Sequence, residues 1–197
     1  MNSTPNPLSD RLADALQLAC QLHNGQRRRI SGAPYVAHLL HAAGIVLDAG
    51  GTEDEAIAAL LHDAVEDQGG SETRARIEAQ FGPTVARIVD ECSDTDQMPK
   101  PPWRGRKEAF LARLADSSTS AQLVTAADKL DNVSGLIDGY HALGEQLWDH
   151  FHGGRDGTLW YYRAIVDVLR HAGKCPLIEP LDRAVTQLEQ LTAQTEP

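Results

Sequence analysis

Ala59-Leu-Leu-His-Asp-Ala-Val-Glu-Asp67 joins an apolar run to four side chains that can bind a metal or move a proton. Residues four apart share one face of an α-helix, so a helix here brings His62 near Glu66 and Asp63 near Asp67. His62 and Asp63 can then reach one cation, while the two later carboxylates lie about 5–6 Å further along, where they can orient or deprotonate a water. A His-Asp pair also arises by chance, and carboxylates at a helix end are often only solvated, so the rest of the chain must decide.

The composition favours a single all-α domain. At 197 residues the chain has a length at which a domain buries roughly 70% of the surface that its unfolded chain exposes. Only 5% of the residues are aromatic, and runs of alternating β-branched residues are scarce, which disfavours strands. We therefore expect residues 1–197 to form one helical domain.

Charge and cysteine content narrow the partners and the compartment. The net charge is −10, with 18 basic and 28 acidic residues, which argues against nucleic acid and membranes as main partners. Cys20, Cys92 and Cys175 are odd in number and far apart, so they indicate neither a disulfide framework nor a cysteine zinc site. Residues 1–10 lack the pattern of a signal peptide, and no run approaches about 18 apolar residues. We expect a soluble, cytoplasmic protein.

Apolar periodicity and cap signals predict a succession of helices. They cover residues 8–23, 34–48, 53–67, 72–80, 83–92, 103–115, 121–137, 158–171 and 181–191. Asn24-Gly25 ends the first helix, Pro34 begins the second, and Thr52 with Glu55 has the spacing of a capping box before the third. Residues 93–102 are polar and proline-rich, and this predicted loop is long enough to be a lid.

Candidate metal ligands are spread over three of these helices. His38 lies on the second, His62 and Asp63 on the third, and Asp128 on the helix at 121–137. Imidazoles and carboxylates together suit a divalent metal and leave positions open for water or phosphate oxygens. The competing interpretation pairs Asp128 with Lys129 or an arginine, because a buried carboxylate needs a partner.

Two further features have an ordinary explanation. Arg27, Arg28 and Arg29 form a basic run in an acidic chain; solvated charge is the default interpretation, and a site for an anionic substrate is the alternative. The remaining histidines, including His41, have no comparable neighbours in the sequence, so we interpret them as surface or core residues.

Five motifs in order carry a family resemblance. They are His23-x-Gly25-Gln26, Ser31-Gly32-x-Pro34-Tyr35-x-x-His38, Ala59-Leu-Leu-His62-Asp63-x-x-Glu66-Asp67, Phe81-Gly82-x-x-Val85 and Ala127-Asp128-Lys129-Leu130-x-Asn132. The set resembles the hydrolase domain of the RelA/SpoT homologues, and most of all the stand-alone small alarmone hydrolases. The resemblance is strongest over residues 8–140, and we expect the helices in 141–191 to form a packing extension.

The resemblance implies an all-α HD-domain bundle, of roughly 8–10 helices, which removes the 3′-diphosphate of guanosine alarmones as pyrophosphate. It implies one manganese ion, Mn2+, with His38, His62, Asp63 and Asp128 as ligands. Glu66 and Asp67 would be the catalytic residues that serve the nucleophilic water. The nucleotide would be bound by Arg28, Arg29 and Asn132.

Three positions depart from the family pattern. Ile30 follows Arg29 where a lysine is usual, Asp131 stands where the hydrolases commonly have His or Tyr, and Val133-Ser-Gly135 replaces Met-Arg-Thr or similar. These changes leave the metal ligands intact and the base preference open. The alternatives are an adenosine alarmone, NADPH or a nucleoside 5′-monophosphate as substrate, or a non-catalytic nucleotide sensor. A small-molecule nucleotide is the expected partner, Arg155 is a candidate phosphate contact, and the sequence leaves a homo-oligomer open.

Overall fold

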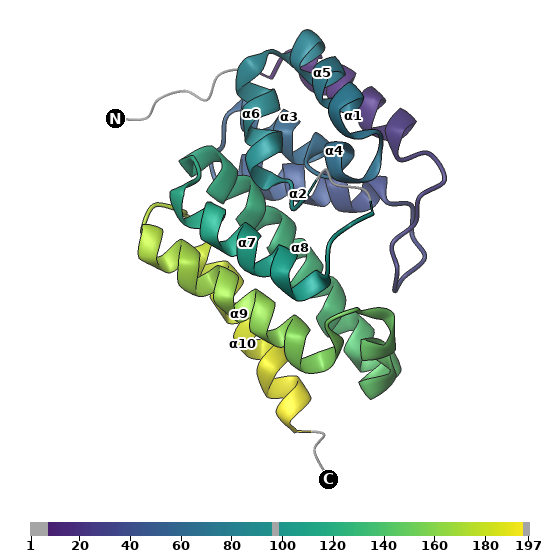
Figure 1. Ribbon diagram of the computed structural model, residues 1–197, viewed down its shortest axis with the longest axis vertical. Coiled ribbons are helices and arrows are strands. Elements are labelled where there is room, and N and C mark those ends of the chain that lie inside the picture. The colour runs from purple at the N-terminus through teal and green to yellow at the C-terminus, as the bar shows by residue number, and fades with distance from the viewer. Residues whose placement is uncertain (1–7, 96–98, 195–197) are drawn as a thin grey trace.

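The computed structural model describes residues 8–95 and 99–194, and within them the chain is all-α (Figure 1). The helices are α1 (Asp10–Leu22), α2 (Val36–Asp48), α3 (Glu53–Leu61), α4 (Ala64–Asp67), α5 (Gly70–Phe81), α6 (Pro83–Cys92), α7 (Trp103–Asp116), α8 (Thr119–Leu143), the 3-10 helix η1 (Gly144–His150), α9 (Gly154–Ala172) and α10 (Ile178–Ala193). The predicted fold class is confirmed in the described residues. None of their helices has the length and apolarity needed to cross a membrane.

Helix starts follow the cap signals of the sequence. The Ser9 side chain accepts a hydrogen bond from Arg11 N at the start of α1. At the start of α3, Thr52 and Glu55 exchange side-chain and backbone hydrogen bonds as a capping box. Pro83 opens α6, where its missing N–H costs no helical hydrogen bond. These local signals fix where the apolar faces begin.

The long helix α8 forms the centre of the molecule. It packs against α2, α3 and α6 on the N-terminal side and against α9 and α10 on the C-terminal side, as Figure 1 shows for its place between the two groups. The first half of α8, Ala121 to Asp128, is buried throughout. A carboxylate on this half therefore faces the core, where α2 and α3 can supply partners.

The predicted helix over 53–67 is wrong at one point, because α3 ends at Leu61 and α4 begins at Ala64. The imidazole of His62 hydrogen-bonds the Ala59 carbonyl oxygen at 2.8 Å. In a continuous helix that oxygen would accept from the N–H of Asp63. The break therefore turns His62 and Asp63 inward together, while Asp67 N–H still bonds to the Asp63 carbonyl at 3.0 Å, one turn into α4.

Other boundaries shift for reasons of packing. Pro34 does not open α2; it pairs with Arg27 in an isolated bridge, and the helix starts two residues later. The helix predicted at 121–137 continues to Leu143 through Gly139, where an added Cβ would lie 2.9 Å from Ile30 Cγ2. Close packing on the glycine thus compensates for its low helix propensity.

The C-terminal helices pack on the second half of the molecule: α9 packs against α7, and α10 packs against α8 and α9. The indole of Trp103, at the start of α7, lies against the start of α9, where a Cβ added to Gly153 would be 2.7 Å from its Cη2 atom. On α9, Arg163 pairs with Asp182 at 2.5 Å and Glu189 at 2.6 Å on α10. Residues 96–98 of the loop predicted at 93–102 lie outside the described residues, so its role as a lid stays a prediction.

Candidate functional site

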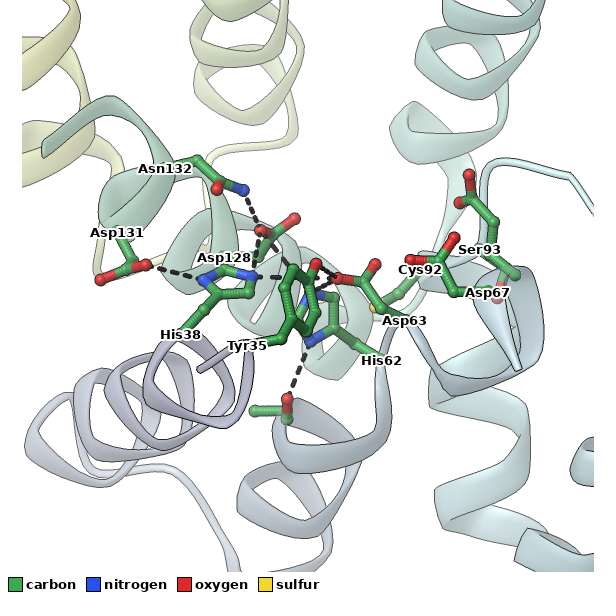
Figure 2. A network of polar contacts seen from close by, with 12 residues as sticks. Tyr35, His38, His62, Asp63, Asp67, Cys92, Ser93, Asp128, Asp131 and Asn132 are labelled. Carbon is green, nitrogen blue, oxygen red and sulfur yellow. Dashed lines mark hydrogen bonds and ion pairs between the residues drawn. The ribbon is translucent and has the colours of Figure 1, made fainter. Parts of the chain in front are cut away.

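The four predicted metal ligands come together between α2, α3, α4 and α8. His38 Nε2 lies 3.3 Å from Asp128 Oδ1, and His62 Nε2 lies 3.6 Å from the same oxygen. Asp63 Oδ2 is 3.1 Å from His62 Nε2 and 3.9 Å from His38 Nε2. Figure 2 shows the four side chains pointing toward one another. We call these four residues the ligand cluster.

The cluster fits a divalent cation. In the described part of the chain, the Nε2 atoms of His38 and His62 are buried and have no hydrogen-bond partner. One ligand atom each from His38, His62 and Asp128 lies within 4.8 Å of the others. Buried polar atoms without partners are rare in proteins, and a cation among two imidazoles and two carboxylates would satisfy all of them.

Neighbouring groups fix the orientation of each ligand. The Nδ1 atom of His62 bonds to the Ala59 carbonyl, and Nδ1 of His38 lies 2.7 Å from Asp131 Oδ2. Asp63 accepts a hydrogen bond from the hydroxyl of Tyr35. Partners that hold the far nitrogen or oxygen of a ligand set the direction of the near one.

Asp128 has two close partners on its own helix. Lys129 Nζ lies 2.5 Å from Asp128 Oδ2, and Asn132 donates to Asp128 Oδ1. The alternative pairing of Asp128 with Lys129 is therefore present together with the contacts to the imidazoles, because the two carboxylate oxygens face different sides.

The electrostatics keep the carboxylates ionised. Burial opposes ionisation of Asp128, yet Lys129 and the neighbouring imidazoles hold its pKa well below its ordinary value. Burial also opposes ionisation of Asp63, and His62 lowers its pKa all the same. Burial alone would lower the pKa of His62, but Asp63 and Asp128 raise it well above its usual range. The cluster therefore attracts positive charge.

Glu66 and Asp67 stand beside the ligand cluster on α4 and are bridged by one cation. Lys100 Nζ lies 2.9 Å from Glu66 Oε1 and 3.2 Å from Asp67 Oδ1. The other oxygens accept from the backbone N–H of Asp94 and the amide of Gln26, both at 3.2 Å. The pair is thus oriented from both sides, and Asp67 lies one helical turn after Asp63, to which its backbone N–H bonds.

A second group of cations lies at the start of α7. Asp94 Oδ2 is 2.6 Å from Arg106 Nη1 and 2.7 Å from Lys107 Nζ, and its side chain is only 6% exposed. Burial, and then repulsion from Lys129, lowers the pKa of Lys107. We call Lys100, Arg106 and Lys107 the cation arm.

The predicted nucleotide-binding residues lie on the side of the ligand cluster away from Asp67, as Figure 2 shows for Asn132. Arg28 Nη1 donates to Asn132 Oδ1 at 2.8 Å. Arg29 donates to the His150 carbonyl at 2.7 Å and lies 5.7 Å from the Phe151 ring centre. One pocket of about 1320 Å³ joins these groups. It is lined by all three predicted nucleotide-binding residues, by the ligand cluster except His62, and by the cation arm.

Sequence reasoning missed several residues of this pocket. Asp131 was noted only as a departure from the family, and His41, taken for a surface or core histidine, lines the pocket and bonds to Asp131 at 2.8 Å. Asp94 and Lys100 fell within a polar loop with no pattern to single them out. Arg155 does not line the pocket; it donates to the Thr192 carbonyl.

Comparison with known proteins places the chain in a family. The model of the HD domain matches residues 15–158. Guanosine-3′,5′-bis(diphosphate) 3′-pyrophosphohydrolase MESH1 of Homo sapiens is 38% identical over 128 residues, which cover 64% of this chain and 69% of that protein. MESH1 of Drosophila melanogaster is 37% identical over 131 residues, with 65% and 70% covered.

Solved structures agree. One that is described as a metazoan ortholog of SpoT that hydrolyzes ppGpp has a TM-score of 0.76 and 32% identity, covering 93% of this chain and 98% of the other. The protein lmo0812 of Listeria monocytogenes has a TM-score of 0.67 at 29% identity, covering 78% and 99%. The chain therefore belongs to the HD domain family and, within it, to the family of the MESH1 pyrophosphohydrolases.

Proposed function

We propose that this protein is a metal-dependent hydrolase that removes the 3′-diphosphate of a guanosine alarmone as pyrophosphate. The observation that carries the proposal is the ligand cluster, whose buried Nε2 atoms on His38 and His62 have no partner in the described residues. The names of the relatives, which act on guanosine-3′,5′-bis(diphosphate), supply the substrate class. In this proposal His38, His62, Asp63 and Asp128 hold one manganese ion.

Release of pyrophosphate defines the bonds that change. The oxygen of a water forms a bond to the phosphorus next to the ribose 3′-oxygen, and the bond between that phosphorus and the 3′-oxygen breaks. The ribose oxygen takes up a proton, and the water loses one. A divalent cation, when bound, supplies Lewis acidity that makes a water more acidic and polarises phosphoryl oxygens.

Glu66 and Asp67 handle the proton in this proposal. All four of their oxygens accept a hydrogen bond, from Lys100, Asp94 N–H or Gln26 at 2.9 to 3.2 Å, so the carboxylates cannot rotate freely. A carboxylate fixed in this way keeps further lone pairs, with which it can accept the proton of a water. Holding both carboxylates in place before substrate arrives removes an entropic cost from the transition state.

The cations around the pocket offset the charge of the phosphates. The cation arm on one side and Arg28 on the other face a substrate with several negative charges, and such preorganised charges stabilise the phosphoryl transition state. Ion pairs within the protein, such as Lys100 with Glu66 at 2.9 Å, keep these cations in place. At Arg106 and Lys107 the phosphates then replace Asp94 as the partner, while Lys100 stays with Glu66 and Asp67.

Product identification tests the proposal. Purified protein is incubated with manganese and, separately, with the guanosine 3′-diphosphate alarmone, its adenosine counterpart, NADPH and a nucleoside 5′-monophosphate, in water enriched in 18O. We expect pyrophosphate carrying one 18O atom, together with unlabelled GDP from the guanosine compound. Pyrophosphate from the adenosine compound alone would change the base, and orthophosphate from NADPH or the monophosphate alone would overturn the proposal.

The metal is tested in the same assay. A chelator should abolish turnover, and manganese should restore more of it than magnesium, zinc or cobalt does. Full activity in the chelator would contradict the metal-dependent mechanism. Metal binding without turnover of any of these compounds would favour a nucleotide sensor. The cytoplasmic location stays a prediction of this proposal.

A further inference from the structure

Asp131 lies where the ligand cluster meets the arginine loop at residues 27–29. Its Oδ2 atom is 2.7 Å from His38 Nδ1, and its Oδ1 atom is 2.8 Å from His41 Nδ1. Arg28 Nη2 lies 3.2 Å from Oδ2, and the Asp131 side chain is only 12% exposed. One carboxylate on α8 thus contacts two adjacent turns of α2 and the loop that precedes it, as Figure 2 shows for the contact with His38.

The contact with Asp131 determines which nitrogen of His38 is free. An ionised carboxylate can only accept hydrogen bonds, so Nδ1 of His38 carries the proton that is shared with Asp131. In the neutral ring this leaves a lone pair on Nε2, the atom that faces Asp128 at 3.3 Å. An imidazole binds a metal through such a lone pair, and its other nitrogen needs an acceptor to hold the ring in this tautomer.

The other imidazole of the cluster is held differently. His62 Nδ1 bonds to the carbonyl of Ala59, one turn earlier in its own chain segment. The backbone itself therefore orients His62. The Nδ1 partner of His38 is instead the side chain of Asp131, 93 residues later in the chain. A single substitution can therefore remove it.

Asp131 also closes a ring of polar contacts. His38 Nε2 faces Asp128, which accepts from Asn132, and the Asn132 oxygen accepts from Arg28 Nη1 at 2.8 Å. Arg28 returns to Asp131 at 3.2 Å, and Asp131 to His38 at 2.7 Å. The ring therefore joins two metal ligands to the arginine loop through Asp131.

We propose that Asp131 is a positioning residue for the metal site, which holds the His38 ring with Nε2 directed at the cation and ties that ring to Arg28. The inference rests on the proposed function only for the presence of a metal. Neither the base nor the reaction enters it, so its test can be made without a substrate.

The test is direct titration of chelator-treated protein with manganese by calorimetry, in wild type and three variants. Asp131→Asn keeps the size and one acceptor oxygen but removes the charge, and we expect affinity to fall about tenfold. Asp131→Leu removes the acceptor, and we expect a loss of about 100-fold. His41→Ala is the matched control: it breaks the other contact of Asp131 at a side chain that is 67% exposed, and affinity should stay within about twofold.

Circular dichroism and thermal melting accompany each titration. Normal folding with weakened manganese binding in the Asn variant supports the inference, even if wild-type protein cleaves no alarmone. Manganese affinity in Asp131→Asn within twofold of wild type would overturn it, even if alarmone cleavage is confirmed. Equal losses in His41→Ala and Asp131→Asn would also overturn it, because they would mark Asp131 as a clamp between helices. If Asp131→Leu fails to fold, the Asn variant alone decides.

Discussion

The ligand cluster and the cation arm belong to one pocket, yet their polar groups differ in whether they have partners within the protein. In the cluster, two imidazole nitrogens have no hydrogen-bond partner in the described residues. In the arm, every cation contacts a carboxylate: Lys100 contacts Glu66 and Asp67, and Arg106 and Lys107 contact Asp94. In the proposed function a bound cation completes the cluster, whereas the arm is completed by carboxylates of the protein itself.

This difference separates two tasks of the pocket. In the proposed function the cluster gains most from metal binding, because its ligands are already buried and oriented. An arm whose cations are already paired gains less from a phosphate, since each new contact replaces an existing one. We therefore expect substitutions in the cluster to have larger effects than substitutions in the arm.

The largest effect is expected for His62→Ala. Loss of one of two buried imidazoles should abolish manganese binding and lower turnover by at least about 1000-fold, the equivalent of roughly 4 kcal/mol. Turnover, calorimetry and circular dichroism measure this together. His171→Ala is the control, because that exposed histidine bonds only to the Asp167 carbonyl among the described residues. Wild-type turnover in the His62 variant would remove the cluster from the mechanism.

Lys129→Met tests the connection between the ligand cluster, where Lys129 contacts Asp128, and the cation arm, where it repels Lys107. The variant removes a buried cation that lies 2.5 Å from Asp128 and is 16% exposed. Breaking a buried pair leaves an uncompensated charge, so the free energy of unfolding should fall by about 3 kcal/mol in a chelator. Manganese should restore part of the loss by neutralising Asp128. Urea titrations with and without metal measure both values, and unchanged stability in the chelator would contradict the argument.

Asp94→Asn should have a smaller effect, confined to the arm. The amide keeps the shape of the side chain, but Arg106 and Lys107 lose their common anion and their fixed positions. We expect the KM for the alarmone to rise about tenfold with a smaller change in kcat. Glu108→Gln is the matched control, since Glu108 pairs with Arg104 at the surface with 57% exposure. A KM equal to that of wild type would show that Asp94 does not organise the arm.

The smallest effect concerns Cys92, which is half-buried and lines the pocket. Burial raises the pKa of its thiol to about 12, so the reactive thiolate is scarce at neutral pH and increases as pH rises. Iodoacetamide at pH 8 should therefore modify the exposed Cys20 well before Cys92, and the rate at Cys92 should rise about tenfold per pH unit between about pH 7 and 9. Peptide mass mapping measures both rates; comparable rates would contradict a half-buried, protonated thiol at Cys92.

The sequence predicted all four residues of the ligand cluster, because His38 and Asp128 lie in helices with a clear apolar pattern and His62 and Asp63 directly follow one. Period and cap signals placed His38 on α2 and Asp128 on α8. The motif at residues 59–67 identified His62 and Asp63, although not the helix break between α3 and α4. At that break the His62 imidazole bonds to the Ala59 carbonyl, a contact that no propensity scale contains.

The cation arm and Asp131 could not be predicted in the same way. Asp94 follows α6 in a polar segment, and nothing local distinguishes an acidic residue that turns inward from one that faces water. The role of Asp131 depends on His38 and Arg28, which lie 93 residues or more away in the chain. Contacts of this kind arise only when the helices have packed.

The packing of Trp103 against Gly153 gives the protein a built-in optical signal. Trp103 lines the pocket, whereas Trp148 and Trp160 do not. Its indole is fixed between α7 and the start of α9, within the same wall as the cation arm. Emission from this one indole should change when a nucleotide enters, so fluorescence can follow ligand binding on the millisecond scale without a label, even in variants that no longer catalyse the reaction.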